Sequence, residues 1–255
     1  MLGQQEQFEG EKIQVIDLDP NLVLNEDESK QQYLKHFEKL KEIKETIIAR
    51  KKENRTEMIR RGLLNQFIEF LNWARNQKVK EYARNIQTQT CDAISIVMSD
   101  NPEAIELAIN NEFILQLKML LNQDIPLEEV NAIHISSVKS LCTFGNPENR
   151  QELFNLGMQQ AIIRNLKSKN PKVTLYTAAS IYKIISSEWY LSGNKCLHPQ
   201  FEVLEHDGVI NALFEDGIKE GNDEETKFFC ADCLGLLYQK RELPEIMKKE
   251  VIKKY

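Results

Sequence analysis

The residues with the greatest potential for chemistry are four possible metal ligands in the C-terminal third of the chain. Cys230 and Cys233 form a CxxC motif, and Cys196 and His198 lie upstream of it. Thiolate sulfur and imidazole nitrogen are the ligands of tetrahedral zinc sites. Such a site requires residues 188–199 to fold back on the CxxC segment, whereas free cysteines in a packed helix behave as small apolar residues. We therefore treat all four as weak metal candidates and expect no cofactor.

The other histidines do not indicate catalysis. His134 lies between two isoleucines near the start of a predicted helix, where a buried, hydrogen-bonded histidine is the expected structure. His36 and His206 have no nucleophile at a recognisable spacing. The sequence contains no GxGxxG, GxxxxGK[ST], GxSxG or HExxH motif. We expect a protein that is not an enzyme, with no catalytic residue and no small-molecule substrate.

The elements that carry these residues are predicted to be helices. The 255 residues include only ten glycines and seven prolines, about half the usual share, which disfavours the many tight turns of all-β folds. No segment approaches the roughly 20 apolar residues of a membrane helix, and the polar, acidic start is unlike a targeting peptide. Five cysteines, an odd number, indicate reduced thiols. We expect an all-α, intracellular protein, cytoplasmic rather than nuclear.

Charge is unevenly distributed along the chain. The net charge is −6, with −7 in residues 1–28, +6 in residues 29–61 and −5 in the remainder. The acidic balance excludes a general nucleic-acid binder, because phosphate binding needs clustered positive charge. Residues 1–28 are predicted to be an acidic extended tail. Its apolar patch between Ile13 and Leu24 makes it a candidate arm for docking a partner.

Residues 29–61 are predicted to form one long, charged, amphipathic helix. Its apolar stripe has spacings of three and four residues, at Tyr33, Phe37, Leu40, Ile43 and Ile47. A basic run near its end is a candidate partner-binding patch, although such a run is more often a solvated helix face. This run includes Lys51, Lys52, Arg55, Arg60 and Arg61.

From Gly62 onward an apolar pattern recurs, with a small or apolar residue followed by apolar residues three and six places later. The four occurrences are Cys91–Ile94–Val97, Val138–Leu141–Phe144, Ala178–Ile181–Ile184 and Ala231–Leu234–Leu237. Their first residues lie 47, 40 and 53 positions apart, in the range of helical solenoid repeats. Asn111, Gly157 and Gly208 precede three of these helices, at corners where a left-handed residue ends one helix and another begins.

The clearest repeat unit covers residues 146–187 and closely resembles an armadillo repeat. The residues that match the family pattern are Asn149, Arg150, Leu153, Gly157, Ile162, Leu166, Asn170, Pro171, Ala178, Ala179, Ile181 and Ile184. The resemblance covers about residues 62–240. It implies an armadillo- or HEAT-like right-handed helical solenoid of about four repeats, preceded by the tail and the charged helix, with residues 241–255 as a basic cap.

The resemblance also implies a groove lined by the last helix of each repeat. In armadillo proteins that carry nuclear-import cargo, this helix presents a Trp and an Asn at fixed places. Here the Trp places are Asp92, Lys139, Ala179 and Asp232, and the Asn places are Ile96, Thr143, Lys183 and Leu236. Recognition of basic import signals is therefore not expected. Lys139 and Lys183 instead predict a ligand that is acidic or rich in carbonyl groups.

We expect the protein to be a non-catalytic scaffold for protein–protein interaction. Trp189 and Tyr190 are candidate interface anchors, although Trp189 fits equally well as a cover for its own repeat. A structural subunit of a larger assembly, for example cytoskeletal or ciliary, is the leading expectation. A reversible peptide-binding transport or signalling adaptor is the alternative, and a zinc-binding or enzymatic protein is the third.

Metal analysis of the purified chain tests the third alternative. Because the CxxC residues are expected to pack in a helical core, we expect less than about 0.2 zinc ions per chain after purification without chelators. A stoichiometric zinc content that is lost on substitution of Cys230 and Cys233 by serine contradicts this expectation.

Overall fold

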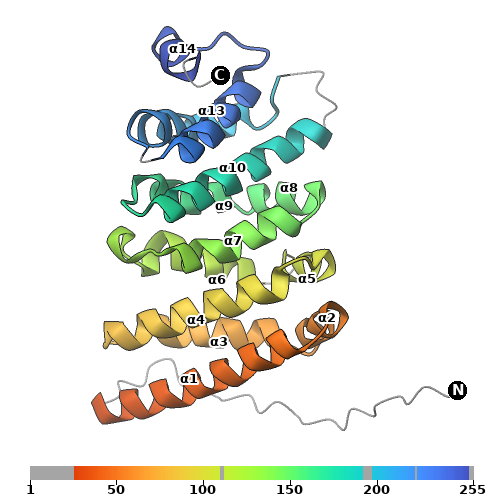
Figure 1. Ribbon diagram of the computed structural model, residues 1–255, viewed down its shortest axis with the longest axis vertical. Helices are drawn as coiled ribbons and strands as arrows, with labels where there is room; N and C mark the ends of the chain where they lie inside the picture. The colour runs from red at the N-terminus through yellow and green to blue at the C-terminus, as the bar shows by residue number, and fades with distance from the viewer. Residues whose placement is uncertain (1–25, 110–111, 192–196, 222, 253–255) are drawn as a thin grey trace, which may run out of the picture.

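The computed structural model describes residues 26–109, 112–191, 197–221 and 223–252 (Figure 1). Over these ranges the secondary structure is entirely helical. The tail up to residue 25, the corner at Asn111, the metal candidate Cys196 and the last three residues lie outside them. No described helix is both long enough and apolar enough to cross a membrane.

Four units of three helices stack along one axis (Figure 1). The first unit consists of α2 (Lys52–Arg60), α3 (Leu63–Arg75) and α4 (Lys80–Met98). The second consists of α5 (Pro102–Ile109), α6 (Phe113–Met119) and α7 (Ala132–Phe144). The third consists of α8 (Pro147–Asn155), α9 (Met158–Ile163) and α10 (Pro171–Leu191). The fourth consists of α11 (Phe201–His206), α12 (Val209–Ala212) and α13 (Glu224–Tyr238).

Two further helices close the ends of the stack, and short turns extend the middle helices. Helix α1 (Glu26–Ala49) packs against α4, and α14 (Glu245–Ile252) packs against the turn after α12. The second helices of three units continue into other helical segments. These are the π-helices Leu120–Asp124 and Leu213–Lys219 and the 3-10 helix Arg164–Lys167. A further tight turn, Leu127–Glu129, precedes α7. The predicted four-repeat solenoid is thus confirmed.

The long third helices form the centre of the core. They stand side by side in the order α4, α7, α10, α13, and α1 precedes them in the same row (Figure 1). Ile94, Leu141, Ile181 and Leu234, the middle residues of the four predicted triplets, are fully buried. A helix with one apolar face cannot bury it alone, so each repeat completes the core of its neighbours.

The predicted single helix over residues 29–61 is wrong, because the chain forms two helices there. Helix α1 ends at Ala49, Lys51 is extended, and α2 begins at Lys52. Arg55 of α2 donates from Nε to the Ile47 carbonyl (2.9 Å) and from Nη1 to the Ile96 carbonyl (3.2 Å). Those carbonyls lie near the C-terminal ends of α1 and α4, so the bend fits α2 into the first repeat.

The same arginine contact recurs two repeats later. Arg150 of α8 donates from Nε to the Cys142 carbonyl at 2.7 Å, again eight residues back along the chain. Both arginines therefore satisfy a carbonyl in the last turn of the preceding long helix. This equivalence identifies α1 as a counterpart of the long third helices, and α2 as the start of the first complete repeat among the described residues.

The predicted corners at Gly157 and Gly208 are confirmed, with φ values of 74° and 75° directly before a helix. Gly62, which was not predicted as a corner, has the same conformation, with a φ value of 96° before α3. In this left-handed region a residue with a Cβ atom is strained. The glycines allow the chain to turn between the first and second helices of a repeat without an added loop.

Gly208 gives the cleanest test of this strain, because a Cβ atom built there meets no other atom within 4 Å. We expect Gly208→Ala to lower the free energy of unfolding by about 1 kcal/mol through backbone strain alone. Gly208→Asn should lower it less, since asparagine tolerates this conformation better. Urea denaturation of the three proteins measures the difference, and equal stabilities would show that the corner is not strained.

Candidate partner-binding surface

The candidate site is the surface formed by the outward sides of α1, α4, α7, α10 and α13, which we call the ladder face. These helices lie in one layer at the front of the stack in Figure 1, with the second helices behind them. The ladder face is therefore a continuous surface that runs the length of the stack. Each repeat contributes one rung, and residues at the same place in successive rungs line up along the axis.

The middle of the ladder face carries Lys139 and Lys183, the two lysines predicted for the groove. The Lys139 ammonium of α7 lies 4.1 Å from the centroid of the Tyr176 ring of α10, a cation–π geometry that holds the side chain across two rungs. Burial raises the pKa of the Cys142 thiol of α7 to about 12, and the charge of Lys183 on α10 opposes this rise. The two lysines thus occupy neighbouring rungs and are partly exposed.

The C-terminal part of the ladder face is aromatic. The rings of Tyr182 and Phe229, from α10 and α13, lie 5.7 Å apart, and Phe228 packs edge-on against Phe229 at 6.1 Å. Phe228 is 48% exposed. A shallow depression beside this cluster is lined by Tyr182, Asp232 and Leu236 among others. Sequence reasoning did not list these aromatic residues as candidate anchors, although the adjacent phenylalanines at the start of α13 are a visible signal.

Trp189 and Tyr190 have different environments. Trp189 is buried, at 6% exposure, and its ring lies parallel to that of His198 at 6.3 Å. It therefore fits the alternative in which it covers the core of its own repeat. Tyr190 is 67% exposed and remains available as an anchor at the end of α10.

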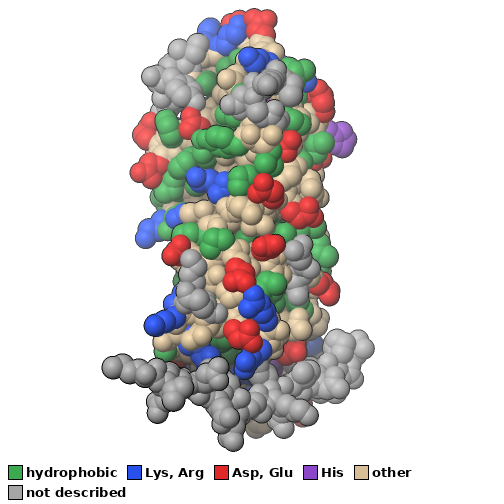
Figure 2. Space-filling model, turned by 90° about the vertical axis from the view of Figure 1, so that its right-hand side faces the viewer, with side chains coloured by type: hydrophobic (Ala, Val, Ile, Leu, Met, Phe, Trp, Pro, Cys, Tyr) green, Lys and Arg blue, Asp and Glu red, His purple; other side chains and the backbone are tan. Residues whose placement is uncertain are grey.

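Three residues of the basic run at the end of the predicted long helix have partners within the chain, and the prediction that the run binds a partner stays a prediction. Arg55 is bound to backbone carbonyls, Arg60 pairs with Glu103, and Arg61 pairs with Glu57 at 2.8 Å. Lys51 is exposed, and the side chain of Lys52 is not described. On the side of the molecule seen in Figure 2, acidic and basic side chains are interspersed.

Three of the four metal candidates have other structural roles. Cys230 and Cys233 are buried in α13, and burial raises the pKa of the Cys230 thiol to about 12. The Cys230 sulfur lies only 2.4 Å from the place that a Cβ atom on Gly217 would take, so the glycine makes room for it. His198 uses Nε2 with the Ile185 carbonyl and Nδ1 with the Gln200 N–H, at 3.1 and 3.3 Å.

A metal cluster does not form among the parts of the chain that the structure describes. There, no three His, Cys, Asp or Glu side chains are arranged to hold a metal ion. Cys196, the remaining candidate, lies outside those parts, so the metal prediction stays a prediction.

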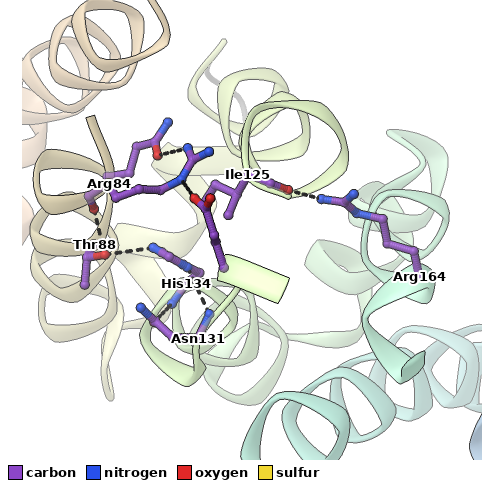
Figure 3. Close-up of polar contacts among 8 residues, drawn as sticks. Arg84, Thr88, Ile125, Asn131, His134 and Arg164 are labelled. Carbon is purple, nitrogen blue, oxygen red and sulfur yellow. Dashed lines mark hydrogen bonds and ion pairs between the residues drawn. The ribbon is translucent and has the colours of Figure 1, made fainter. Parts of the chain in front are cut away.

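The loop before α7 is held by arginines from the repeats on both sides (Figure 3). Arg84 of α4 forms an ion pair with Glu129 in this loop. Arg164, which follows α9, donates to the carbonyls of Ile125 (2.5 Å) and Leu121 (2.9 Å). Buried backbone carbonyls need such partners. The two arginines hold the start of α7, which is the helix that carries Lys139.

His134 is buried in this loop junction, as its sequence context predicted. Its Nδ1 accepts the Asn131 N–H at 3.1 Å, so the neutral ring carries its proton on Nε2, which donates to the Thr88 hydroxyl at 2.9 Å (Figure 3). The hydroxyl donates in turn to the Arg84 carbonyl at 2.8 Å. Burial, aided by the Arg84 charge, lowers the pKa of His134 to about 4.

Comparison with solved structures identifies the architecture as an armadillo-repeat fold. An engineered protein from the Northeast Structural Genomics Consortium superposes with a TM-score of 0.60 at 19% identity, over 92% of this chain and 84% of its own. A designed armadillo repeat protein in complex with the peptide (KR)4 superposes with a TM-score of 0.59 at 18% identity, over 88% of this chain and 86% of its own. At this identity the likeness shows the fold alone. No protein-family model and no curated protein sequence matches the chain.

Because His134 is neutral in the folded chain, we expect the free energy of unfolding to fall in acid. With a pKa of about 4 in the folded chain and about 6.5 unfolded, its contribution is complete above pH 6.5 and is lost as the pH falls towards 4. The total loss is about 3 kcal/mol in the free energy of unfolding. His134→Asn should flatten this decline, because asparagine does not titrate. Asn149 shows that asparagine can occupy the same place in a capping box.

Urea denaturation at pH 7, 5.5 and 4.5 measures this effect. The buried His36 and His198 also have lowered pKa values, so the wild-type decline has several sources. The difference between wild type and His134→Asn isolates His134. His206→Asn, at an exposed position, is the matched control and should follow the wild type. Parallel wild-type and His134→Asn curves would contradict the assignment.

Proposed function

We propose that the protein is a non-catalytic scaffold that binds an extended segment of a partner protein along the ladder face. The observation that carries this proposal is that Lys139 and Lys183, on the adjacent rungs α7 and α10, occur together with the aromatic cluster of α10 and α13. Exposed aromatic side chains are the usual anchors of a protein interface. Lysines beside them favour a segment that is acidic or rich in carbonyl groups.

The charges around the two lysines support this choice of ligand. Asp92, on the rung before Lys139, pairs with Lys44 of α1 at 2.5 Å, so its charge is already balanced. The Lys139 ammonium is held over Tyr176 and needs little reordering to meet a carboxylate. The free charge in the middle of the ladder face is therefore positive, and the acidic side chains of α13 lie at one end.

The charge of the ladder face differs from the charge expected on a solenoid that binds a basic peptide. The designed armadillo protein of similar fold was solved with (KR)4, an alternating Lys–Arg peptide. In the present chain lysine occupies one of the Trp places and one of the Asn places of import carriers. Because like charges repel at an interface, we propose that the preferred ligand has the opposite charge.

We further propose that the chain is a fixed subunit of a larger intracellular assembly, cytoplasmic and of cytoskeletal or ciliary type. Tyr190 and the exposed Lys51 would provide additional contacts outside the ladder face. A reversible adaptor remains the second candidate, and the two differ in how firmly the partner is held. A permanent subunit retains its partner through washes of high salt, whereas electrostatic capture of a peptide weakens as salt screens the charges.

Charge reversal on the ladder face tests the proposed ligand. We expect the full chain to bind the peptide (DE)4 at least tenfold more tightly than (KR)4. Lys139→Glu together with Lys183→Glu should weaken (DE)4 binding by about tenfold, equivalent to about 1.4 kcal/mol, because two attractive charges become repulsive. Fluorescence anisotropy with labelled peptides at low salt gives both affinities.

The control changes the same net charge elsewhere. Lys169 and Lys240 are exposed and lie before α10 and after α13, so Lys169→Glu with Lys240→Glu should leave (DE)4 binding within about twofold. Equal losses of (DE)4 affinity in both double variants would show that the effect comes from net charge and not from the ladder face. Tighter binding of (KR)4 by the wild type would refute the proposed ligand class.

A further inference from the structure

We propose that the partner segment on the ladder face carries two apolar anchor side chains, about eight residues apart, with its acidic residues between them. One anchor enters a depression between α1 and α4, and the other enters a depression between α10 and α13. This inference rests on the proposed function, because it concerns the ligand of the same surface. It specifies which side chains that ligand carries and how they are spaced.

The register of the repeats shows that the exposed side of α1 continues the ladder face. The two equivalent arginine contacts, from α2 to α1 and from α8 to α7, lie 95 residues apart in the chain. Ile48 of α1 therefore takes the place that Thr143 takes on α7, and Lys44 takes the place of Lys139. Like Lys139, Lys44 reaches across to the next rung, where its ammonium donates to the side chain of Gln89 at 2.8 Å.

The ladder face is hollowed near both of its ends, each time between two rungs. The depression between α1 and α4 has a volume of about 230 Å³, with Phe37 and Ile48 as its apolar lining. The rest of that lining is polar, from Lys41, Lys44, Glu45 and Gln89. The depression between α10 and α13 has a volume of about 370 Å³, and its apolar lining includes Tyr182 and Leu236. Both volumes exceed the roughly 150 Å³ of a protein cavity that binds benzene, so each depression has room for one large apolar side chain.

One row of side chains along the ladder face is apolar at both ends and polar between them. Its members lie five residues after the first residue of each triplet, and on α1 at the place that the arginine contact fixes. From α1 to α13 they are Ile48, Ile96, Thr143, Lys183 and Leu236. Ile48 is 60% exposed, and Leu236 is half-buried. A single exposed isoleucine is ordinary, but an apolar residue that lines a depression at each end of one row favours a ligand with two apolar side chains.

Charge places the acidic residues of the ligand between the anchors. Lys139 and Lys183 lie on the rungs between the first depression and α13, where they attract carboxylates. Asp232 lines the second depression, whereas Asp92, the equivalent residue of α4, forms an ion pair with α1 at 2.5 Å. A carboxylate directly beside the second anchor would be repelled by Asp232. The ligand therefore has an acidic middle and uncharged residues next to its anchors.

The separation of the anchors follows from the spacing of the rungs. Packed helices lie about 8–10 Å apart, so the three steps from the first depression to the second make about 24–30 Å. An extended chain advances about 3.3 Å per residue, so a separation of eight residues spans about 26 Å. Alternate side chains of an extended chain point to opposite sides, so only an even separation turns both anchors towards the ladder face. Eight is the even number that fits this distance.

Two peptides of identical composition test this spacing with the full chain. The peptide FSDEDEDSF has its phenylalanines eight residues apart, whereas FFSDEDEDS has them next to each other, so only the first can fill both depressions. We expect FSDEDEDSF to bind about tenfold more tightly than FFSDEDEDS, because the second anchor binds within an already formed complex. Fluorescence anisotropy with labelled peptides at low salt gives the two affinities and their ratio.

Variants of the chain assign the effect to the two depressions. Ile48→Ser and Leu236→Ser each remove one apolar lining without a change of charge, and each should lower the affinity ratio to about twofold or less. Neither residue belongs to the buried core. The matched control is Leu115→Ser, at a leucine of α6 that is 46% exposed and lies behind the ladder face, and it should leave the ratio unchanged.

The outcomes separate this inference from the proposed function. Equal affinities for the two peptides, or a ratio that Ile48→Ser leaves unchanged, would overturn the two-anchor ligand while binding of an acidic segment stands. Failure of the chain to bind either peptide would overturn the proposed function and this inference with it. A dimer in light scattering that Ile48→Ser converts to a monomer would assign the first depression to a second copy of the chain and also overturn the inference.

Discussion

The structure depends on one constraint, which is that no repeat can bury its own apolar face. The long helices present that face on two sides, and the triplets of α4, α7, α10 and α13, which are buried except for the half-buried Phe144, fill the space between successive rungs. Stability therefore belongs to pairs of neighbours and not to single units. This explains the place of the long helix α1 at the start of the described stack. It buries the free side of the first complete unit, with His36 stacked on Trp73 at 4.7 Å.

The sequence predicts the repeats well because their signals are local. The triplets depend on helical periodicity, and the corners at Gly157 and Gly208 depend on backbone freedom, so both are visible in one repeat. The break between α1 and α2 was not predicted, because Arg50, Lys51 and Lys52 carry no turn signal and fit a helix. The break depends on the tertiary contact of Arg55 with the carbonyls of Ile47 and Ile96. An arginine that binds carbonyls cannot be distinguished in sequence from one that is solvated.

The candidate surface was predicted only in part. The register of the triplets places Lys139 and Lys183 on the ladder face, but the contact of Lys139 with Tyr176 depends on the spacing between two rungs. Trp189 and Tyr190 are adjacent in sequence, yet one is buried and the other exposed, since neighbouring helix positions point about 100° apart. The burial of Trp189 depends on His198, beyond a segment whose path no periodicity predicts. Local pattern thus predicts which face a residue occupies, whereas its partners depend on packing.

The polar bridges between rungs join residues separated by almost constant distances along the chain. Thr88 and His134 are 46 residues apart, Ser95 and Ser140 are 45, and Thr174 and Thr226 are 52. Extensive contacts among the described helices occur within one repeat or between adjacent repeats. A tensile load applied to the two ends of the stack would therefore be carried by each interface in series. Under such a load the interfaces between repeats would open one after another. They would close again when the force is released, so the stack would act as an elastic element.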